Sequence, residues 1–151
     1  MPNVKKILFP MDLVELTREI VPWADLMARR FGAGLHVLHV IPDPGYWGVA
    51  YGIDPSHLDD EPALIRKAEK SAGDLCEEYF GKDLNVSIKA VVGDPAEEIL
   101  RYIEDESISM VVMGTHARRG LERVFFGSVA NRVVKSSPVP VLTVNPHAKS
   151  A

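Results

Sequence analysis

The sequence contains a single cysteine, Cys76, among 151 residues, and it has no long apolar run. One cysteine excludes an internal disulfide and any metal site built from a cysteine cluster. The N-terminal stretch MPNVKKILFPMD has only a very short apolar run before Pro10. That run is too short for the apolar region of a signal peptide and far too short to span a bilayer. These absences favour a soluble cytoplasmic protein.

The sequence also has little excess charge and no recognisable metal-binding spacing. Its net charge of −4 gives no global reason to expect binding to nucleic acid or to an anionic membrane. The five histidines show no HExxH or similar ligand spacing, so no metal site is expected. With 46% apolar and 25% charged residues, the composition is that of one globular domain. We assign this domain to residues 1–147 and a disordered tail to residues 148–151.

Apolar periodicity predicts five strands that alternate with four helices. Short apolar or alternating runs predict strands at residues 4–10, 35–42, 84–93, 108–114 and 138–145. Helical spacing predicts helices from an N-cap at Thr17 to a stop at Gly32 or Gly34, from 61 to 80, from 94 to 106, and from 127 to 137. Pro22 removes a hydrogen bond inside the first helix, which therefore either starts late or kinks there.

Strict alternation of strands and helices predicts an α/β fold, with a parallel sheet and helices on both faces. Such open sheets bind ligands at the carboxyl ends of the strands, where the strand order reverses. The residues after the first and fourth strands, Pro10 to Asp12 and Gly114 onward, are therefore the predicted site.

The segment from Met113 to Val134, MGTHARRGLERVFFGSVANRVV, combines glycines with two arginines before a helix. Glycine lets the backbone N–H groups approach phosphate oxygens, and a helix N-terminus adds free donors and a favourable dipole. Arg118 and Arg119 could add charge-assisted contacts. A long connector with a helix cap and solvated arginines explains the same residues equally well. On chemistry alone, both interpretations stay open.

This segment resembles a motif of the universal stress protein family, whose ATP-binding members carry G-x2-G-x9-G-[ST] after the fourth strand. Gly114, Ala117, Gly127 and Ser128 occupy these positions here, so the spacing is kept and the second glycine is alanine. The stretches KKILFPMD, LHVLHVI, GDPAEEIL and GSVANRVVKSSPVPVLTV are also similar to the family, and the resemblance covers Lys5 to Pro146.

The resemblance implies a Rossmann-like sheet of order 3-2-1-4-5 and an ATP site, with or without Mg²⁺. Asp12 would hydrogen-bond the adenine or its surroundings, between apolar walls from Pro10 and Val40. The implied nucleotide-binding residues are Pro10, Asp12, Val40, Met113, Gly114, Ala117, Arg118, Gly127, Ser128 and Val129. From the residues alone, Asp12 could instead cap a turn and Val40 could be a plain core residue.

Ala117 leaves two outcomes open for nucleotide affinity. If the family glycine uses a positive φ, alanine costs roughly 1–2 kcal/mol at that position. If glycine serves only close approach, the methyl group crowds the phosphates while the backbone N–H donor survives. Besides an ATP-binding regulatory protein, the sequence thus allows a nucleotide-free interaction module with a degraded site.

Catalytic motifs are scarce in the sequence. It contains neither a GxxxxGK[ST] phosphate loop nor a GxSxG elbow, and Asp12 and Glu122 are the only acidic candidates near the predicted site. We expect no dedicated enzyme, although a weak ATPase stays an alternative.

In universal stress proteins the last strand commonly pairs with its copy, so the resemblance implies a homodimer through Val139–Val144. Protein partners of a regulatory kind are expected but unspecified. The aromatic segment from Tyr46 to Tyr51 could cover a nucleotide, contact a partner or have no single role.

Overall fold

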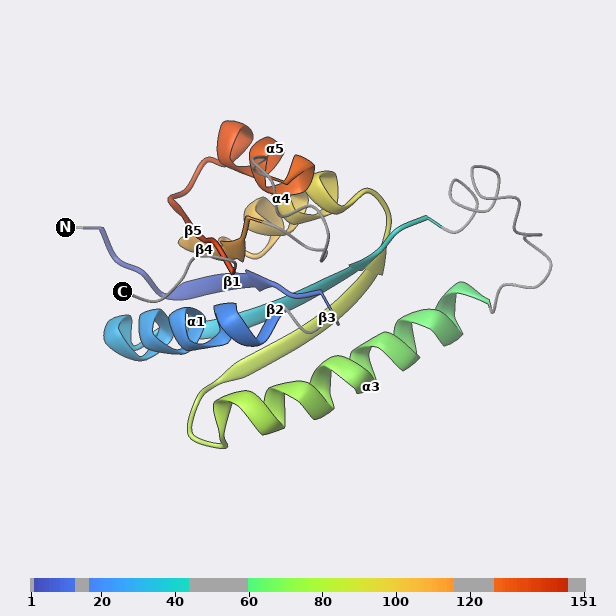
Figure 1. Ribbon diagram of the computed structural model, residues 1–151, viewed down its shortest axis with the longest axis horizontal. Helices are drawn as coiled ribbons and strands as arrows, with labels where there is room; N and C mark the ends of the chain where they lie inside the picture. The colour runs from blue at the N-terminus through green and yellow to red at the C-terminus, as the bar shows by residue number, and fades with distance from the viewer. Residues whose placement is uncertain (1, 13–16, 44–59, 116–126, 147–151) are drawn as a thin grey trace.

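The computed structural model describes residues 2–12, 17–43, 60–115 and 127–146. Within them the chain forms β1 (Lys6–Pro10), α1 (Thr17–Phe31), β2 (Gly34–Ile41), α3 (Glu61–Phe80), β3 (Val86–Val92), α4 (Pro95–Asp105), β4 (Met110–Gly114), α5 (Ser128–Ser136) and β5 (Val141–Val144). All neighbouring strands pair in parallel, in the order β3-β2-β1-β4-β5 (Figure 1). The predicted fold class and strand order are therefore confirmed.

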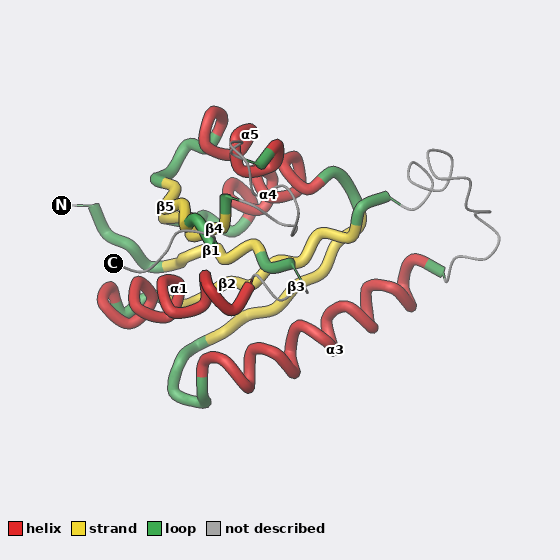
Figure 2. The backbone as a smooth tube through the Cα atoms, viewed as in Figure 1, coloured by secondary structure: helices red, strands yellow, loops and turns green. Residues whose placement is uncertain are grey.

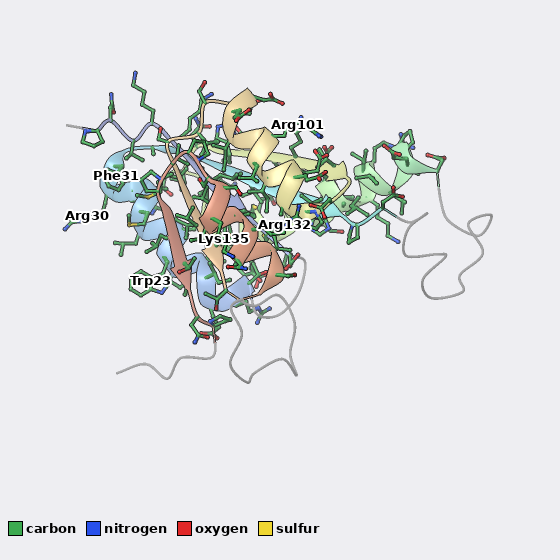
Figure 3. The ribbon with its side chains drawn as sticks, turned by 90° about the horizontal axis from the view of Figure 1, so that it is seen from above. Trp23, Arg30, Phe31, Arg101, Arg132 and Lys135 are labelled. Atoms are coloured by element: carbon green, nitrogen blue, oxygen red, sulfur yellow. The ribbon has the colours of Figure 1, made fainter. Side chains whose placement is uncertain are left out.

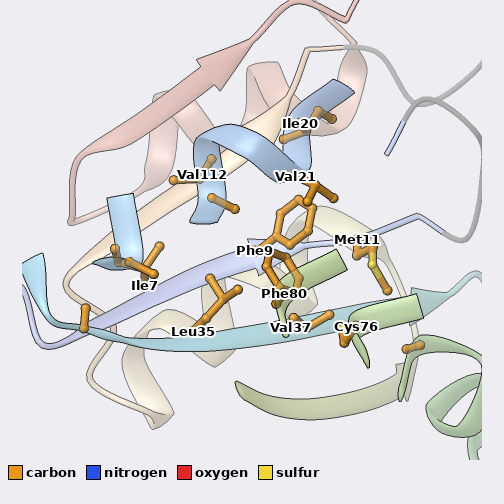
Figure 4. Packing of buried hydrophobic residues seen from close by; sticks show 14 residues of the cluster. Ile7, Phe9, Met11, Ile20, Val21, Leu35, Val37, Cys76, Phe80 and Val112 are labelled. Atoms are coloured by element: carbon orange, nitrogen blue, oxygen red, sulfur yellow. The ribbon is translucent and has the colours of Figure 1, made fainter. Parts of the chain in front are cut away.

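Helices cover both faces of the sheet. α1 and α3 lie on one face, and α4 and α5 lie on the other (Figure 1). Because successive side chains of a strand point to opposite faces, β1 sends Ile7 and Phe9 into the core under α1 and α3, and Leu8 into the core under α4 and α5. Figure 4 shows the first of these cores, in which Phe9 and Phe80 meet near the carboxyl end of β1. The central strand β1 is thus buried on both sides.

Local sequence rules explain where two of the helices begin. The Asp60 carboxylate accepts a hydrogen bond from the Ala63 N–H at 2.8 Å, and Asp94 accepts one from the Glu97 N–H at 2.9 Å. Each aspartate is followed within two residues by a proline in the first helical turn. The predicted helix from Glu61 to Phe80 is confirmed, and the helix predicted from residue 94 begins there with Asp94 as its N-cap.

The first helix differs from its prediction at the N-terminal end. α1 begins at Thr17 and runs through Pro22, so a late start is wrong. Pro22 falls in the second turn, where it has no N–H to donate to the residue four positions earlier. Thr17 is the first helical residue, and its hydroxyl donates to the Asp12 carbonyl instead of acting as the expected cap. At the other end, Gly32 adopts a φ of 61° and stops the helix as predicted.

Cys76 lies on the buried side of α3, in the core that contains Phe9. Burial raises the pKa of its thiol to about 11, so the side chain is protonated at neutral pH. Cys76 is therefore a small core residue. None of the helices described here is long and apolar enough to cross a membrane.

A polar cluster lies under α4 at the amino end of the strands. His36 Nδ1 lies 2.8 Å from the Tyr102 hydroxyl, and the two rings meet edge to face. Lys6 donates to the Glu106 carbonyl at 2.9 Å in the same region. Burial, followed by the positive charge of Lys6, lowers the pKa of His36, while Glu106 opposes this effect. The folded protein therefore favours neutral His36.

This lowered pKa predicts a loss of stability in acid. The unfolded chain protonates His36 near its ordinary pKa of about 6.5, and the folded protein does so only at lower pH. The contribution of neutral His36 is therefore full above about pH 6.5 and is lost as the pH falls through the folded pKa. Between about pH 7 and pH 5 the free energy of unfolding should fall more in the wild type than in His36→Asn. Urea denaturation at both pH values measures the difference, and equal decreases would contradict the prediction.

Candidate functional site

The strand order reverses between β1, the central strand, and its neighbour β4. From β1 the chain continues through α1 to β2, and from β4 it continues through α5 to β5 on the opposite side of the sheet (Figure 2). The two crossovers therefore diverge, and the space beyond the carboxyl ends of β1 and β4 is the usual ligand position in such sheets. Pro10 and Gly114, both predicted site residues, are the last residues of these strands.

A short backbone hydrogen bond brings the start of α5 to the end of β4. The Gly127 N–H donates to the Thr115 carbonyl at 2.6 Å, and the Thr115 N–H donates to the Val144 carbonyl at 2.9 Å. Thr115 is itself buried. Gly114 and Gly127, which are separated by a long segment of sequence, thus lie at one place in the fold. This bond assembles the two ends of the predicted glycine motif.

The N-terminus of α5 offers backbone donors at this place. Gly127 is the N-cap and supplies no side-chain hydrogen bond, and the first turn contains no acidic residue. Ser128 is exposed and Val129 is half-buried. The first N–H groups of a helix have no intrahelical acceptor, and the helix dipole is positive at this end. Such a terminus is suited to an anion such as a phosphate group.

The predicted site residues with apolar side chains lie on the face of the sheet that α4 and α5 cover. Val40, Met113 and Val129 belong to one core cluster under α4 and α5, together with Leu8. Pro10 lies two residues after Leu8 on β1 and therefore faces the same side. Val40 and Met113 are well-buried core members, as the plainer interpretation of Val40 expected, and they lie near the carboxyl ends of their strands.

Asp12 is the second residue after β1 and is exposed. Its carbonyl accepts a hydrogen bond from the Thr17 hydroxyl. Together, the described residues place Pro10, Asp12, Gly114, Gly127 and Ser128 at the carboxyl end of the sheet.

Several predictions fall outside the described residues. This group contains Ala117, Arg118, Arg119 and Glu122, as well as the aromatic segment from Tyr46 to Tyr51 and the tail 148–151. Their predicted roles therefore stay predictions.

Three polar residues that the sequence did not single out as site residues hold the backbone around this site. Thr17 is only 3% exposed and binds the Asp12 carbonyl. Thr115 accepts from Gly127, and His39 Nδ1 lies 2.8 Å from the Met11 carbonyl. Of the three, only His39 interrupts an apolar run of the sequence, between Leu38 and Val40, and that was the available signal. Periodicity could not show which backbone group each would bind.

An ion pair links α5 to the start of α4 near the same region. Arg132 Nη1 lies 2.9 and 3.0 Å from the two carboxylate oxygens of Asp94. The pKa of Asp94 is lowered, most of all by the hydrogen bond from the Glu97 N–H; burial opposes this effect, and the hydrogen bond and charge of Arg132 lower the pKa further. Figure 3 shows Arg132 on α5 together with Lys135. Because Arg132 follows Ser128 by one helical turn on the same face, the start of α5 has a cation beside it.

Across residues 2–12, 17–43, 60–115 and 127–146, no group of three or more His, Cys, Asp or Glu side chains is arranged to hold a metal ion.

Comparison with known proteins gives a consistent result along nearly the whole chain. The sequence profile of the universal stress protein family matches residues 3–145. Universal stress protein MJ0531 of Methanocaldococcus jannaschii is 30% identical over 148 residues, which cover 93% of this chain and 81% of that protein. The solved structure of MJ0577 from the same organism is 28% identical, with a TM-score of 0.77 and 99% coverage of both chains.

A more distant structure shares the fold and contains a nucleotide. It is a universal stress protein from Archaeoglobus fulgidus in complex with dAMP. It is 18% identical to this chain, with a TM-score of 0.62 and coverage of 95% of this chain and 98% of that one.

Proposed function

Because this chain belongs to the universal stress protein family, we propose that it is an adenine-nucleotide-binding regulatory protein of the stress response. ATP, with or without Mg²⁺, is the proposed ligand. The observation that carries the proposal is the hydrogen bond from Gly127 to Thr115, which sets the donors of α5 against the end of β4. The dAMP complex of the Archaeoglobus fulgidus protein supports the same class of ligand.

The phosphates would bind at the α5 terminus and the base at the end of β1. The N–H groups of Ser128 and Val129, with the Ser128 hydroxyl, are suited to phosphate oxygens. Pro10 offers apolar surface for the base, and Asp12 offers hydrogen-bonding groups at the same end. In the proposed arrangement Gly114 lies between these ends, beside the ribose.

We propose a regulatory role in the cytoplasm, without dedicated catalysis, for this protein. Nucleotide occupancy would alter its binding to protein partners. The nucleotide-free alternative rests on Ala117, which replaces the second glycine of the family motif.

Direct binding measurements test this proposal. Protein purified from cells and then denatured should release an adenine nucleotide, and calorimetry with ATP, with and without Mg²⁺, should give a saturable signal. No released nucleotide and no heat would overturn the proposal.

Ala117→Gly should tighten binding by up to about tenfold if alanine costs about 1.4 kcal/mol at this position. A much larger gain would favour the nucleotide-free alternative, and turnover of ATP would support a weak ATPase.

The two edges of the sheet differ in a way that supports a homodimer. On β3, the Glu69 carboxylate on α3 accepts a hydrogen bond from the Ala90 N–H at 3.2 Å, so a side chain covers this edge. On β5, the carbonyls of Pro140 and Val144 bond to β4, which directs the N–H and C=O groups of Val141 and Thr143 away from β4. An edge with such groups is a template for another strand. We therefore propose a homodimer through Val139–Val144.

Thr143→Pro should disrupt this dimer and leave the sheet intact. Proline removes an N–H that points away from β4, and edge strands tolerate it. We expect a rise in the dimer dissociation constant of at least about tenfold, equivalent to about 1.4 kcal/mol. Light scattering coupled to size-exclusion chromatography measures it, with Thr143→Val as the control. A Thr143→Pro protein that stays dimeric would place the interface elsewhere.

A further inference from the structure

Both backbone polar groups of Met11, the residue directly after β1, are bound to β2. The Met11 N–H donates to the Leu38 carbonyl at 2.9 Å, and the Met11 carbonyl lies 2.8 Å from His39 Nδ1. A carbonyl oxygen can only accept, so Nδ1 of His39 carries the proton and donates. This contact fixes the tautomer of neutral His39 as well as the position of the backbone.

His39 reaches this carbonyl from the face of the sheet opposite the proposed ligand. On β2, Leu35, Val37 and His39 are two residues apart, so their side chains point to the same face of the sheet. Leu35 and Val37 lie in the core under α1 and α3. Val40 instead faces α4 and α5, the same side as the start of α5. His39 is therefore placed to act on the site through the backbone, without touching the nucleotide.

Asp12, the next residue, is held by α1. Its carbonyl accepts from the Thr17 hydroxyl, which is buried at the start of α1. The chain from Pro10 to Asp12 is thus fixed by β2 on one side and by α1 on the other. This is the stretch to which we assign the base of the nucleotide.

We propose that His39 is a positioning residue for the adenine end of the site, an inference that rests on the proposed nucleotide binding. Its Nδ1–H bond holds the Met11 carbonyl and so presets the backbone that presents Asp12 to the base. A preset binding surface loses less conformational freedom when the ligand binds, and this difference appears as affinity. Loss of the bond should weaken ATP binding by about tenfold, which corresponds to ordering the backbone of about one residue when the ligand binds.

Two amide substitutions separate this role from simple packing. The amide nitrogen of asparagine is as many bonds from Cβ as histidine Nδ1, whereas that of glutamine is one bond further. His39→Asn can therefore keep the donor to Met11, and His39→Gln and His39→Leu cannot keep it in place. Calorimetry should give near wild-type affinity for His39→Asn and about tenfold weaker ATP binding for the other two. The fitted stoichiometry reports the folded fraction of each protein.

His36 provides a matched control on the same strand. Its Nδ1 also makes a hydrogen bond, but to Tyr102 on the other face and near the opposite end of β2. His36→Leu should change stability and leave ATP affinity within about twofold of the wild type. Wild-type affinity in His39→Leu and His39→Gln, or equal weakening in His39→Asn, would overturn the role of His39 alone. A wild-type protein that binds no adenine nucleotide would overturn the proposed function and this inference together.

Discussion

Ser128→Glu should weaken ATP binding by about 100-fold or more without destabilising the fold. The substitution sets a carboxylate at the first residue of α5, where we place the phosphates. Two like unit charges 4 Å apart repel by about 4 kcal/mol at an effective dielectric constant near 20, and solvent exposure of Ser128 reduces this value. The helix itself favours an acidic residue at this end, so the melting temperature should stay constant or rise slightly.

Ser136→Glu is the matched control, because Ser136 is an exposed serine at the last residue of the same helix. It adds the same charge at the opposite end, where the dipole disfavours it. Calorimetry should show ATP affinity within about twofold of the wild type, together with a small loss of thermal stability. Equal losses of affinity in both variants would mean that net charge, and not the α5 terminus, determines binding.

Phe9→Ala should lower the free energy of unfolding by about 3–5 kcal/mol. Phe9 is fully buried in the central strand, and its ring meets that of Phe80 edge to face, with centroids 6.2 Å apart. Truncation leaves a cavity between β1 and α3 that neighbouring side chains refill only in part. Urea denaturation monitored by circular dichroism measures the loss.

Phe31→Ala makes the same chemical change at the end of α1, where the side chain is 47% exposed. Figure 3 shows Phe31 on the outer side of the molecule near Arg30. Its stability should change by less than about 1 kcal/mol, since exposed substitutions leave no core cavity. Similar losses in Phe9→Ala and Phe31→Ala would contradict the assignment of Phe9 to the core.

Features that depend on neighbouring residues in the sequence were predicted well. Asp94 followed by Pro95, and Gly127 followed by Ser128, mark helix starts through short-range backbone geometry, and both lie where the sequence placed them. Strand ends were predicted less well. The last strand covers only Val141–Val144 of the predicted 138–145, because ladder pairing with β4 decides where an edge strand begins.

Features that depend on contacts between distant residues could not be predicted from one sequence. The bond from Gly127 to Thr115 follows from how β4 and α5 are placed, and no local pattern encodes it. Pro22 shows the opposite case, in which a local rule allowed a late start of the helix and tertiary packing overrides it. Ile20, Val21 and Ala24 surround that position and are buried against the sheet, so α1 continues through it.

The bond between Gly127 and Thr115 also has an evolutionary consequence. It joins the chain on both sides of residues 116–126, so the entry and exit of that segment are set by the sheet and α5. For a segment with fixed ends, doubling its length costs only about 0.6 kcal/mol in closure entropy. Substitutions and changes of length in that segment should therefore cost the fold little stability, whereas a change of length would alter the glycine spacing of the proposed phosphate site. Ligand preference can then diverge by replacement of this one segment while the rest of the domain is inherited intact.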